Sequence, residues 1–271
     1  MRSAVVLVVM SALLALTGCS KKSATSVAPT IGQMKVMMTD APAPYDAVNL
    51  VVSEVSANSG SGWQVLSTGA TAVDLLSLSN GVFATLADGA VPAGGYNQVR
   101  LLLAPGSNVV VGGVTYPLNV PSGLQSGLKL NGAFEVPAGG VLSLQMDFDA
   151  AKSIHQNGAG DYILDPVIRM IPASEAGAIA GLVAPASLGA TVQVFQGDVE
   201  LTTTLANTDG SFKVAVLPAG TYLLRVTTGS GTTMLVRDVV VVAGQTTSVG
   251  TISFVSSGTG KFPGKRPGGG S

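Results

Sequence analysis

Two aspartates separated by one residue have a spacing that could support metal chemistry. Asp147 and Asp149 flank Phe148. On a β-strand both carboxylates would point to one side and the phenyl ring to the other, because successive side chains alternate. Ca²⁺ takes six to eight oxygen ligands, and Asp40 is a further aspartate that could contribute one. We therefore treat Asp147, Asp149 and Asp40 as a candidate calcium site.

A structural role for the same aspartates competes with calcium. Phe148 would then pack in the core while the carboxylates face water or cap turns, with Asp149 as the N-cap of a short helical turn. Arg100 and Lys129 stand in apolar strand patterns and are candidate ion-pair partners for these carboxylates. An ion pair would occupy the oxygens that calcium needs, so both alternatives stay open.

The single histidine and the single tryptophan are the other side chains with chemical potential. A hydrolytic triad would place His155 beside an activated serine, but the sequence contains no Gly-x-Ser-x-Gly elbow. We therefore expect His155 to be a solvated loop residue and the protein not to be an enzyme. Trp63 could be a sugar-binding platform if its ring is exposed, although core packing is the alternative. Aromatic residues make up only 5% of the chain, which weakens a carbohydrate-binding interpretation.

The N-terminus has the pattern of a secretory signal. Arg2 supplies a positive charge, and residues 4–16 form an unbroken run of apolar and small side chains. This run is too short to cross about 30 Å of hydrocarbon as a mature helix. Shortly after it stands Cys19, the only cysteine.

The run Leu16-Thr17-Gly18-Cys19 resembles the bacterial lipobox. That resemblance implies a diacylglyceryl group on the Cys19 thiol, cleavage between Gly18 and Cys19, and acylation of the new amino terminus. Several acyl chains on one residue suffice for stable anchoring in membrane lipid. The residue after the anchor is Ser20 rather than aspartate, so resemblance to the usual sorting rule implies the outer membrane if the cell has one. The alternatives are an ordinary signal peptide with a chance cysteine and an uncleaved helix.

Composition narrows the possible partners. Charged residues are 11% of the chain and the formal net charge is −1. A nucleic-acid-binding protein should carry a basic patch, so we exclude that class. With Cys19 lipidated, no thiol remains for a disulfide or a cysteine-based metal site. The folded part must therefore be stable through its hydrophobic cores alone.

The composition along the chain predicts five segments, two of which are strand-rich domains. Gly and Pro separate many short apolar runs rich in Val, Leu and Thr, which is typical of an all-β protein. We predict two β-sandwich domains in tandem. The segments are a signal peptide (1–18), a lipidated tether (19–31), a first domain (32–172), a second domain (177–255) and a disordered basic tail rich in Gly and Pro (256–271).

The expected elements of the first domain form a meander. A short helix is expected over residues 83–88, and the remaining elements are strands. The expected strands are 33–38, 48–55, 63–66, 72–76, 96–103, 109–111, 114–118, 128–130, 141–148 and 162–170.

Seven strands are expected in the second domain, as in a sandwich. Asn207-Thr208-Asp209-Gly210 predicts a hairpin turn, because Gly210 can adopt a positive φ. The expected strands are 178–183, 191–195, 199–206, 212–216, 221–227, 233–242 and 246–254.

A Pro-Ala-Gly phrase occurs three times, starting at Pro92, Pro137 and Pro218, each time before an apolar strand. Proline presets φ for a turn and glycine reverses the chain. Shared turn chemistry explains the phrase, and duplication of an ancestral unit is the alternative.

Each domain is similar to a known family. Thr208-Asp209-Gly210-Ser211-Phe212 followed by Leu217-Pro218-Ala219-Gly220-Thr221-Tyr222 resembles the carboxypeptidase-regulatory-like family, which implies a seven-stranded transthyretin-like or starch-binding-like sandwich with an accessory role. Some related folds bind carbohydrate, and the family brings no catalytic residues.

The first domain resembles the bacterial lipoprotein domain-of-unknown-function family 4382, which brings no assigned biochemistry. The motifs that carry this resemblance include Thr39-Asp40-Ala41-Pro42, Val73-Asp74-Leu75-Leu76, Pro92-Ala93-Gly94-Gly95-Tyr96 and Asp147-Phe148-Asp149.

Together these observations predict a membrane-anchored, extracytoplasmic envelope lipoprotein that acts as a non-enzymatic binding or adhesion module. Envelope glycan or a surface protein is the expected partner. The alternative is a structural or assembly subunit that docks another envelope protein through an open strand edge. A hydrolase is a third hypothesis, which would require a cluster of His155 with serine and aspartate.

Overall fold

The computed structural model describes residues 30–121 and 126–254. The signal peptide with its cleavage site at Gly18, the lipidation site at Cys19 and the basic tail lie outside these residues. Within them, no helix is long and apolar enough to cross a membrane. The described chain is almost entirely β-structure, which confirms the predicted all-β sandwich class.

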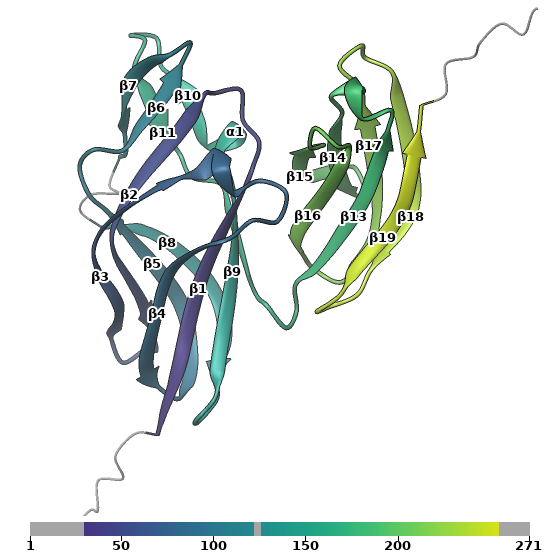
Figure 1. Cartoon of the computed structure of the whole chain (residues 1–271). Helices are drawn as coiled ribbons and strands as arrows, with labels where there is room; N and C mark the ends of the chain where they lie inside the picture. Colours follow the sequence, from purple (N-terminus) through teal and green to yellow (C-terminus); the bar gives the residue numbers. More distant parts are fainter. Residues whose placement is uncertain (1–29, 122–125, 255–271) are drawn as a thin grey trace, which may run out of the picture.

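Residues 31–172 build a sandwich of two sheets, which we call the first sandwich (Figure 1). One sheet has the order β12-β9-β1-β4, and the other has the order β10-β11-β7-β6-β2-β5-β8 with β3 paired to β2. The strands are β1 (Ile31–Ala41), β2 (Ala47–Asn58), β3 (Trp63–Asp74), β4 (Ala84–Pro92), β5 (Gly94–Leu103), β6 (Asn108–Val111), β7 (Val114–Asn119), β8 (Leu128–Val136), β9 (Val141–Asp149), β10 (Ile154–Gln156), β11 (Tyr162–Leu164) and β12 (Ile168–Pro172), with a 3-10 turn (Leu75–Leu78) and a short helix α1 (Ala150–Ser153) between them.

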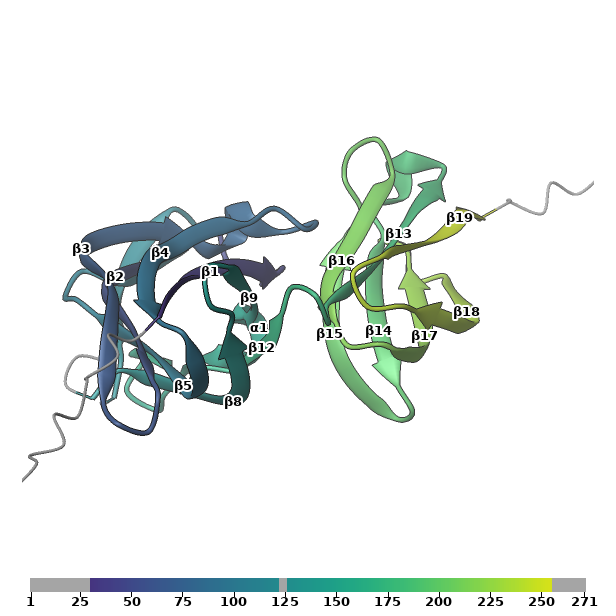
Figure 2. The ribbon, with the colours of Figure 1, turned by 90° about the horizontal axis from the view of Figure 1, so that it is seen from below.

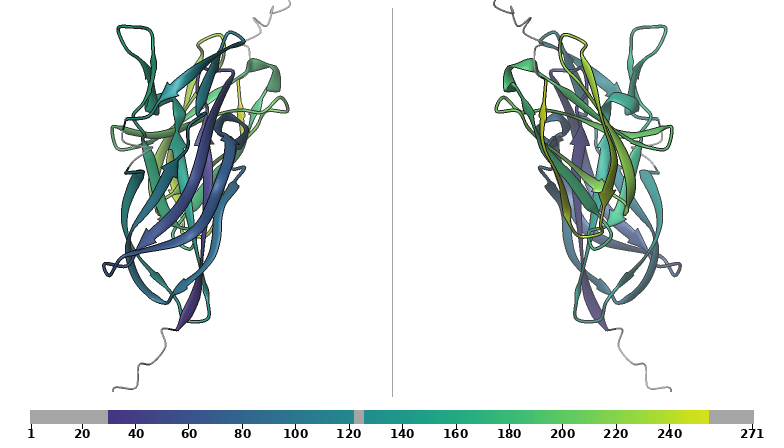
Figure 3. Two further views of the ribbon diagram at one scale, coloured as in Figure 1. Left: turned by 90° about the vertical axis from the view of Figure 1, so that its left-hand side faces the viewer. Right: turned by 90° about the vertical axis from the view of Figure 1, so that its right-hand side faces the viewer.

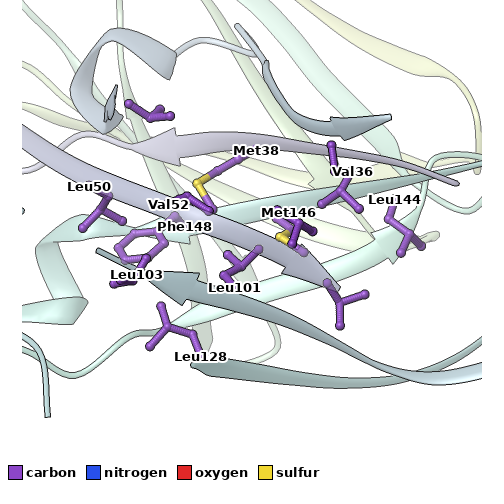
Figure 4. Packing of buried hydrophobic residues seen from close by; sticks show 14 of the residues in the cluster. Val36, Met38, Leu50, Val52, Leu101, Leu103, Leu128, Leu144, Met146 and Phe148 are labelled. Atoms are coloured by element: carbon purple, nitrogen blue, oxygen red, sulfur yellow. The ribbon is translucent and has the colours of Figure 1, made fainter. Parts of the chain in front are cut away.

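Alternating side chains of these sheets form one core. On β1, Met34, Val36 and Met38 are buried and alternate with more exposed residues, as a strand with one face in the core requires. Phe148 of β9 packs into the same cluster with side chains from β2, β5 and β8 (Figure 4). The expectation that Phe148 lies in the core is confirmed.

Residues 177–253 build the second sandwich beside the first. Its sheets have the orders β16-β13-β19 and β15-β14-β17-β18, and they enclose a separate hydrophobic cluster. Its strands are β13 (Gly177–Ala184), β14 (Thr191–Gln196), β15 (Val199–Leu205), β16 (Ser211–Leu217), β17 (Gly220–Thr227), β18 (Thr233–Val241) and β19 (Thr246–Ser253).

The two sandwiches lie side by side, joined by the segment between β12 and β13 (Figure 2). When the molecule is viewed along the line that joins them, one lies behind the other (Figure 3). Each sandwich has its own core, but the division into independently folding domains at residues 172–177 stays a prediction.

Residues 207–210 form a turn at Gly210 as expected, but not a hairpin, because the strands before and after it, β15 and β16, belong to different sheets. Gly210 has φ +84° and its N–H donates to the carbonyl of Asn207 over 2.8 Å. A Cβ on Gly210 would lie 2.3 Å from the carbonyl oxygen of Val183, so the turn has room only for glycine.

Two of the three Pro-Ala-Gly phrases end in a tyrosine corner. The Tyr96 hydroxyl donates to the carbonyl of Pro92 over 2.8 Å, and the Tyr222 hydroxyl donates to the carbonyl of Pro218 over 2.7 Å. Both tyrosines are buried, at 3% and 2% exposure. The phrase therefore does more than turn the chain, because a tyrosine four residues after the proline fastens the turn to the following strand.

Removing the hydroxyl of Tyr222 tests this corner. We expect Tyr222→Phe to lower the free energy of unfolding by about 1–2 kcal/mol, because the hydrogen bond is removed and the carbonyl of Pro218 loses its donor. Urea unfolding monitored by circular dichroism measures the change. Tyr116→Phe is the matched control, because Tyr116 is exposed, and it should change stability by less than about 0.5 kcal/mol. Equal effects of the two variants would refute the corner.

Several expectations about the first sandwich are wrong. The expected strands 63–66 and 72–76 are one strand, β3, which ends before the 3-10 turn that starts at Leu75. Residues 83–88 do not form a helix, because β4 is recruited as an antiparallel partner of β1. Residues 162–170 are not one strand, because the chain leaves β11 at Leu164 and enters a different sheet as β12. The sheets are not a meander, because β1 pairs with the distant β9 in parallel.

Candidate functional site

The three predicted site aspartates lie together at the ends of two neighbouring strands. β1 and β9 run in parallel with Asp40 beside Phe148, so Asp40 comes near the aspartates on either side of that ring. Asp40, Asp147 and Asp149 are only 5%, 7% and 5% exposed. Such burial is costly for ionised carboxylates without partners, so the contacts of each carboxylate determine whether it can be charged.

Asp147 is held by Arg169, which also contacts the second sandwich. Arg169 on β12 donates from Nη2 to Asp147 Oδ2 over 2.5 Å. Its Nε donates over 2.8 Å to the carbonyl of Val216 on β16. Thr202 on β15 adds a side-chain hydrogen bond to Asp147. One carboxylate and one guanidinium therefore join the two sandwiches.

Asp149 has a local structural role. Its Oδ1 accepts from the N–H of Lys152 over 3.0 Å, which confirms it as the N-cap of α1. Lys152 Nζ lies 2.7 Å from Asp149 Oδ2, so this oxygen, which accepts no hydrogen bond of good geometry within the described residues, is still held by the ammonium charge. The Ser153 hydroxyl donates to the carbonyl of Asp149 over 2.6 Å. These contacts fix the turn that leaves β9.

Asp40 has the fewest stabilising contacts of the three aspartates. Its Oδ1 accepts from the N–H of Ala150 over 3.1 Å, whereas its buried Oδ2 has no hydrogen-bond partner among residues 30–121 and 126–254. Burial above all, with the nearby charges of Asp147 and Asp149, raises the pKa of Asp40 from 3.8 to about 9. Asp40 is therefore protonated and uncharged at neutral pH.

The pKa of Asp147 is raised less. Burial raises it from 3.8 to about 6, while the charge of Arg169 opposes that rise. The two carboxyl groups thus differ in their charge at neutral pH, because only one of them has an arginine beside it.

This arrangement favours an ion pair over a calcium site. Arg169 occupies one Asp147 oxygen and Lys152 lies beside Asp149, while Asp40 carries a proton at neutral pH. Across the described residues, no group of three or more His, Cys, Asp or Glu side chains is arranged to hold a metal ion. Calcium binding by these aspartates stays a prediction that these contacts do not favour.

The cations that we expected from the sequence are not the ones that pair. Arg100 donates from Nη2 to Glu54 Oε1 over 2.7 Å, within the first sandwich. Lys129 is exposed on β8, opposite Arg100 in register. Both strands belong to the sheet opposite β9, so neither cation is a strand neighbour of the aspartates.

A second set of contacts at the same junction comes from Asn80. Its Nδ2 donates to the carbonyl of Leu205 and to Asn207 Oδ1, both over 2.9 Å. Its Oδ1 accepts from the Thr204 hydroxyl over 3.1 Å and from the N–H of Lys213 over 3.2 Å. One amide side chain of the first sandwich thus meets four groups of the second, and it uses its full hydrogen-bonding capacity.

We call this polar contact the junction; its residues are Asp40, Asn80, Asp147, Arg169, Thr202 and Val216. The sequence pattern identified two of these residues. The signal that could have pointed to Asn80 is the Asn80-Gly81 pair, because asparagine tolerates the left-handed φ of +57° that Asn80 adopts.

Trp63 does not present a free ring face for a sugar. The guanidinium of Arg100 lies 4.3 Å from the centroid of its ring, in a cation–π contact. The ring is partly buried at the start of β3. The Trp63 sugar platform stays a prediction, and this contact occupies one face of the ring.

His155 is exposed, as expected for a solvated residue, but it lies on the strand β10 and not in a loop, and it pairs in register with Ile163 of β11. No hydrogen bond joins its side chain to a serine or an aspartate within the described chain. Among residues 30–121 and 126–254, His155 therefore forms no hydrogen-bonded cluster with serine and aspartate of the kind that the hydrolase hypothesis requires.

A family model described as "Domain of unknown function (DUF4382)" matches residues 31–166. This range covers β1 to β11 and includes all three aspartates. No curated protein matches the chain.

Solved structures offer only distant similarities. The Bacillus anthracis TIE protein is 12% identical, with a TM-score of 0.24; the match covers 83% of this chain and 51% of that one, so this chain spans about half its length. GBS52, the minor pilin of Streptococcus agalactiae, is 10% identical with a TM-score of 0.24, covering 86% of this chain and all of that one. At these TM-scores the structures do not superpose as wholes, so their roles do not transfer to this chain.

Proposed function

The chain belongs to the family described as "Domain of unknown function (DUF4382)", and because this description names no activity, we propose from the chain's own features that it is a lipid-anchored, non-enzymatic binding module of the cell envelope. It is tethered through Cys19 to membrane lipid and holds its sandwiches outside the cytoplasm. Its partner is an envelope glycan or a surface protein.

The positions of the strands at the two ends of the first sandwich are the observation that carries this proposal. β1 begins at one end, and β6, β7, β10 and β11 lie together at the opposite end (Figure 1). Residues 20–30 would reach at most roughly 40 Å when extended, at about 3.3–3.6 Å per residue. An anchor at Cys19 would therefore hold the start of β1 close to the membrane and present the opposite end to the surroundings.

The junction supports the role of a rigid display module. Arg169 and Asn80 each bind groups of the second sandwich, so the short linker is not the only connection between the two parts. Each of these hydrogen bonds stabilises the observed arrangement of the two sandwiches relative to others in which it is broken. We further propose that the second sandwich, with its three-stranded and four-stranded sheets, is the carboxypeptidase-regulatory-like domain indicated by its motifs.

Docking of a partner through a strand edge is the second candidate function, and β18 is an edge strand at which such pairing can be judged. β18 is the outer strand of its sheet and exposes Leu235 and Val240. The same strand carries the exposed charges of Arg237 and Asp238 and a bulge where Asp238 has φ +57°. Charges and bulges on an edge oppose pairing with another strand. We therefore favour the display of a binding site over edge docking.

The anchor is tested by replacing its sulfur. We expect Cys19→Ala to move the protein from the membrane fraction to the soluble or precursor fraction, because no acylated thiol remains to bind the bilayer. Fractionation and intact-mass analysis of the native protein measure the two consequences. Ser23→Ala, four residues further on, is the control and should stay in the membrane. Wild-type protein with an unmodified sulfur, or with its leader attached, would overturn the proposal.

A further inference from the structure

Three of the five tyrosines gather at the end of the first sandwich that lies far from the start of β1. Tyr96 and Tyr222 are the two buried corner residues. The other three, Tyr45, Tyr116 and Tyr162, come from the loop before β2, from β7 and from β11. In a chain with so few aromatic residues, this clustering calls for an explanation beyond core packing.

The three rings form one cluster, in which Tyr45 and Tyr162 are partly buried and Tyr116 is exposed. Tyr45 and Tyr162 contact edge to face with their centroids 6.3 Å apart, and Tyr116 and Tyr162 lie 5.2 Å apart at an angle of 49°. The Tyr45 hydroxyl donates to the carbonyl of Ile154 over 3.1 Å, which fixes the inner ring. Tyr116 is 36% exposed. The inner ring thus supports two outer rings that are accessible from the surface.

A cleft of about 420 Å³ lies along these outer rings, between β7 and the turn that precedes β11. Its walls include Tyr116, Tyr162, Asn119 and Asp161, and we call it the tyrosine cleft. β7 pairs with β11 in parallel, which places Tyr162 beside Leu118 and Ile163 beside Asn119. A volume of this size lies within the range of small-molecule sites.

Polar groups stand at the rim of the aromatic surface. Asn119 is exposed and offers one amide donor group and one acceptor oxygen. Asp161 is positioned by Asn157, whose Oδ1 accepts from the N–H of Asp161 over 2.9 Å and whose Nδ2 lies 3.3 Å from Asp161 Oδ2. The rim therefore combines a carboxylate with an amide next to two rings.

We propose that the tyrosine cleft binds a neutral pyranose unit of a glycan. A pyranose has one apolar face of C–H groups, which can cover an aromatic ring, and a rim of hydroxyls that need donors and acceptors. Tyr116 and Tyr162 supply the rings, and Asn119 and Asp161 supply the polar partners. The one charged side chain in the cleft wall is a carboxylate, which opposes an anionic sugar.

This inference rests on the proposed display function, which would hold the cleft away from the membrane. It replaces Trp63 as the sugar platform, because an arginine covers one face of that indole whereas Tyr116 has an accessible ring. The aromatic total of the sequence argued against a carbohydrate site, but a cleft requires only two well-placed rings.

The test uses the full-length protein, purified in a zwitterionic detergent that has no sugar headgroup. An array of neutral hexose and N-acetylhexosamine oligomers is the probe, and isothermal titration with the strongest hit gives the affinity. We expect Tyr116→Ala and Tyr162→Ala each to weaken binding at least tenfold. Tyr116→Phe should retain affinity within about threefold, since stacking needs the ring rather than the hydroxyl. Tyr45→Phe serves as a matched control outside the cleft wall.

The outcomes separate this inference from the proposed function. Loss of binding in the two alanine variants, with unchanged thermal midpoints for Tyr116→Ala, supports the cleft. Glycan binding that survives both alanine substitutions overturns the cleft but leaves a display module that binds elsewhere. A wild-type protein that binds no neutral glycan also overturns the inference, whereas the anchoring part of the proposed function is judged separately by the Cys19→Ala experiment.

Discussion

Asp40→Asn should nearly abolish the loss of stability that the wild-type protein shows between pH 6.5 and 8.5. In the unfolded chain Asp40 releases its proton near its ordinary pKa of 3.8, whereas burial holds it in the folded protein up to about pH 9. Between these values the folded state binds a proton that the unfolded state has lost. Rising pH therefore favours unfolding, and the stabilisation that is complete below pH 4 disappears as the pH approaches 9.

The expected slope comes from proton linkage. One proton held only by the folded state changes the free energy of unfolding by about 1.4 kcal/mol per pH unit. Asp147 contributes to a similar loss only up to about pH 6, so the window above pH 6.5 belongs to Asp40. Asparagine keeps the oxygen that accepts from the N–H of Ala150 but cannot ionise. The variant should therefore exceed the wild type in stability at pH 8.5.

Urea unfolding at half-unit pH intervals measures the slope, and Asp198→Asn is the control. Asp198 is an exposed aspartate in the turn between β14 and β15, so its replacement should leave the wild-type slope unchanged. A wild-type protein whose stability is flat between pH 6.5 and 8.5 would show that Asp40 is ionised in the folded state. Added calcium in the same titrations tests the metal hypothesis, because a bound divalent cation would favour the ionised carboxylates and raise stability.

The second sandwich was predictable because its signals are local. Asn207-Thr208-Asp209-Gly210 specifies a turn by itself, although this turn connects two sheets instead of closing a hairpin, and each of the seven expected strands has a counterpart in β13 to β19. Gly, Pro, Asn and Asp separate short alternating segments there, so neighbouring residues determine each boundary. The sheet orders were not predictable in this way, since β13 pairs in parallel with the distant β19.

The first sandwich depends more on distant partners. Residues 83–88 carry apolar side chains at a spacing that fits a short helix, but β1 offers a long antiparallel partner, and the resulting ladder runs from Met38 with Ala84 to Ile31 with Pro92. Tertiary pairing overrides a local preference of this size. The end of β11 did have a local signal, because Pro166 cannot donate a ladder hydrogen bond and marks a break between strands.

The junction was beyond the reach of sequence patterns. Alternation placed Phe148 in the core and the flanking aspartates on the opposite side, which suggested that they face water. The second sandwich covers that region, and the sequence does not indicate which surfaces will meet. Arg169 becomes the partner of Asp147 only through the antiparallel register of β12 with β9, which places the two residues opposite each other. Without that register, Arg100 was an equally reasonable choice.

Arg169→Met should destabilise the protein by about 3 kcal/mol near pH 8, because it removes one member of a largely buried ion pair and leaves the other charged. Methionine retains much of the apolar stem, so the loss reports mainly on the guanidinium. The substitution also removes the donor to the carbonyl of Val216, which belongs to the second sandwich. Proteolysis within the linker at residues 173–176 should therefore become faster along with the fall in stability.

The pH dependence of this effect separates an ion pair from simple packing. Arg169 opposes the rise in the pKa of Asp147, which lies at about 6 in the wild type. Below that pH the carboxyl group is protonated and attracts the guanidinium less, so the loss caused by Arg169→Met should be smaller at pH 5 than at pH 8.

Arg100→Met is the matched control, because its 2.7 Å pair with Glu54 is more exposed and lies within one sandwich. That control should cost about 1 kcal/mol or less in ion-pair energy, in addition to its cation–π contact with Trp63, and should leave linker cleavage unchanged. Combining Arg169→Met with Asp147→Asn should restore part of the stability, since the unpaired charge is then gone. A loss that is equal at both pH values, or a double variant no more stable than Arg169→Met, would mean that the contact between the sandwiches depends on shape rather than on charge.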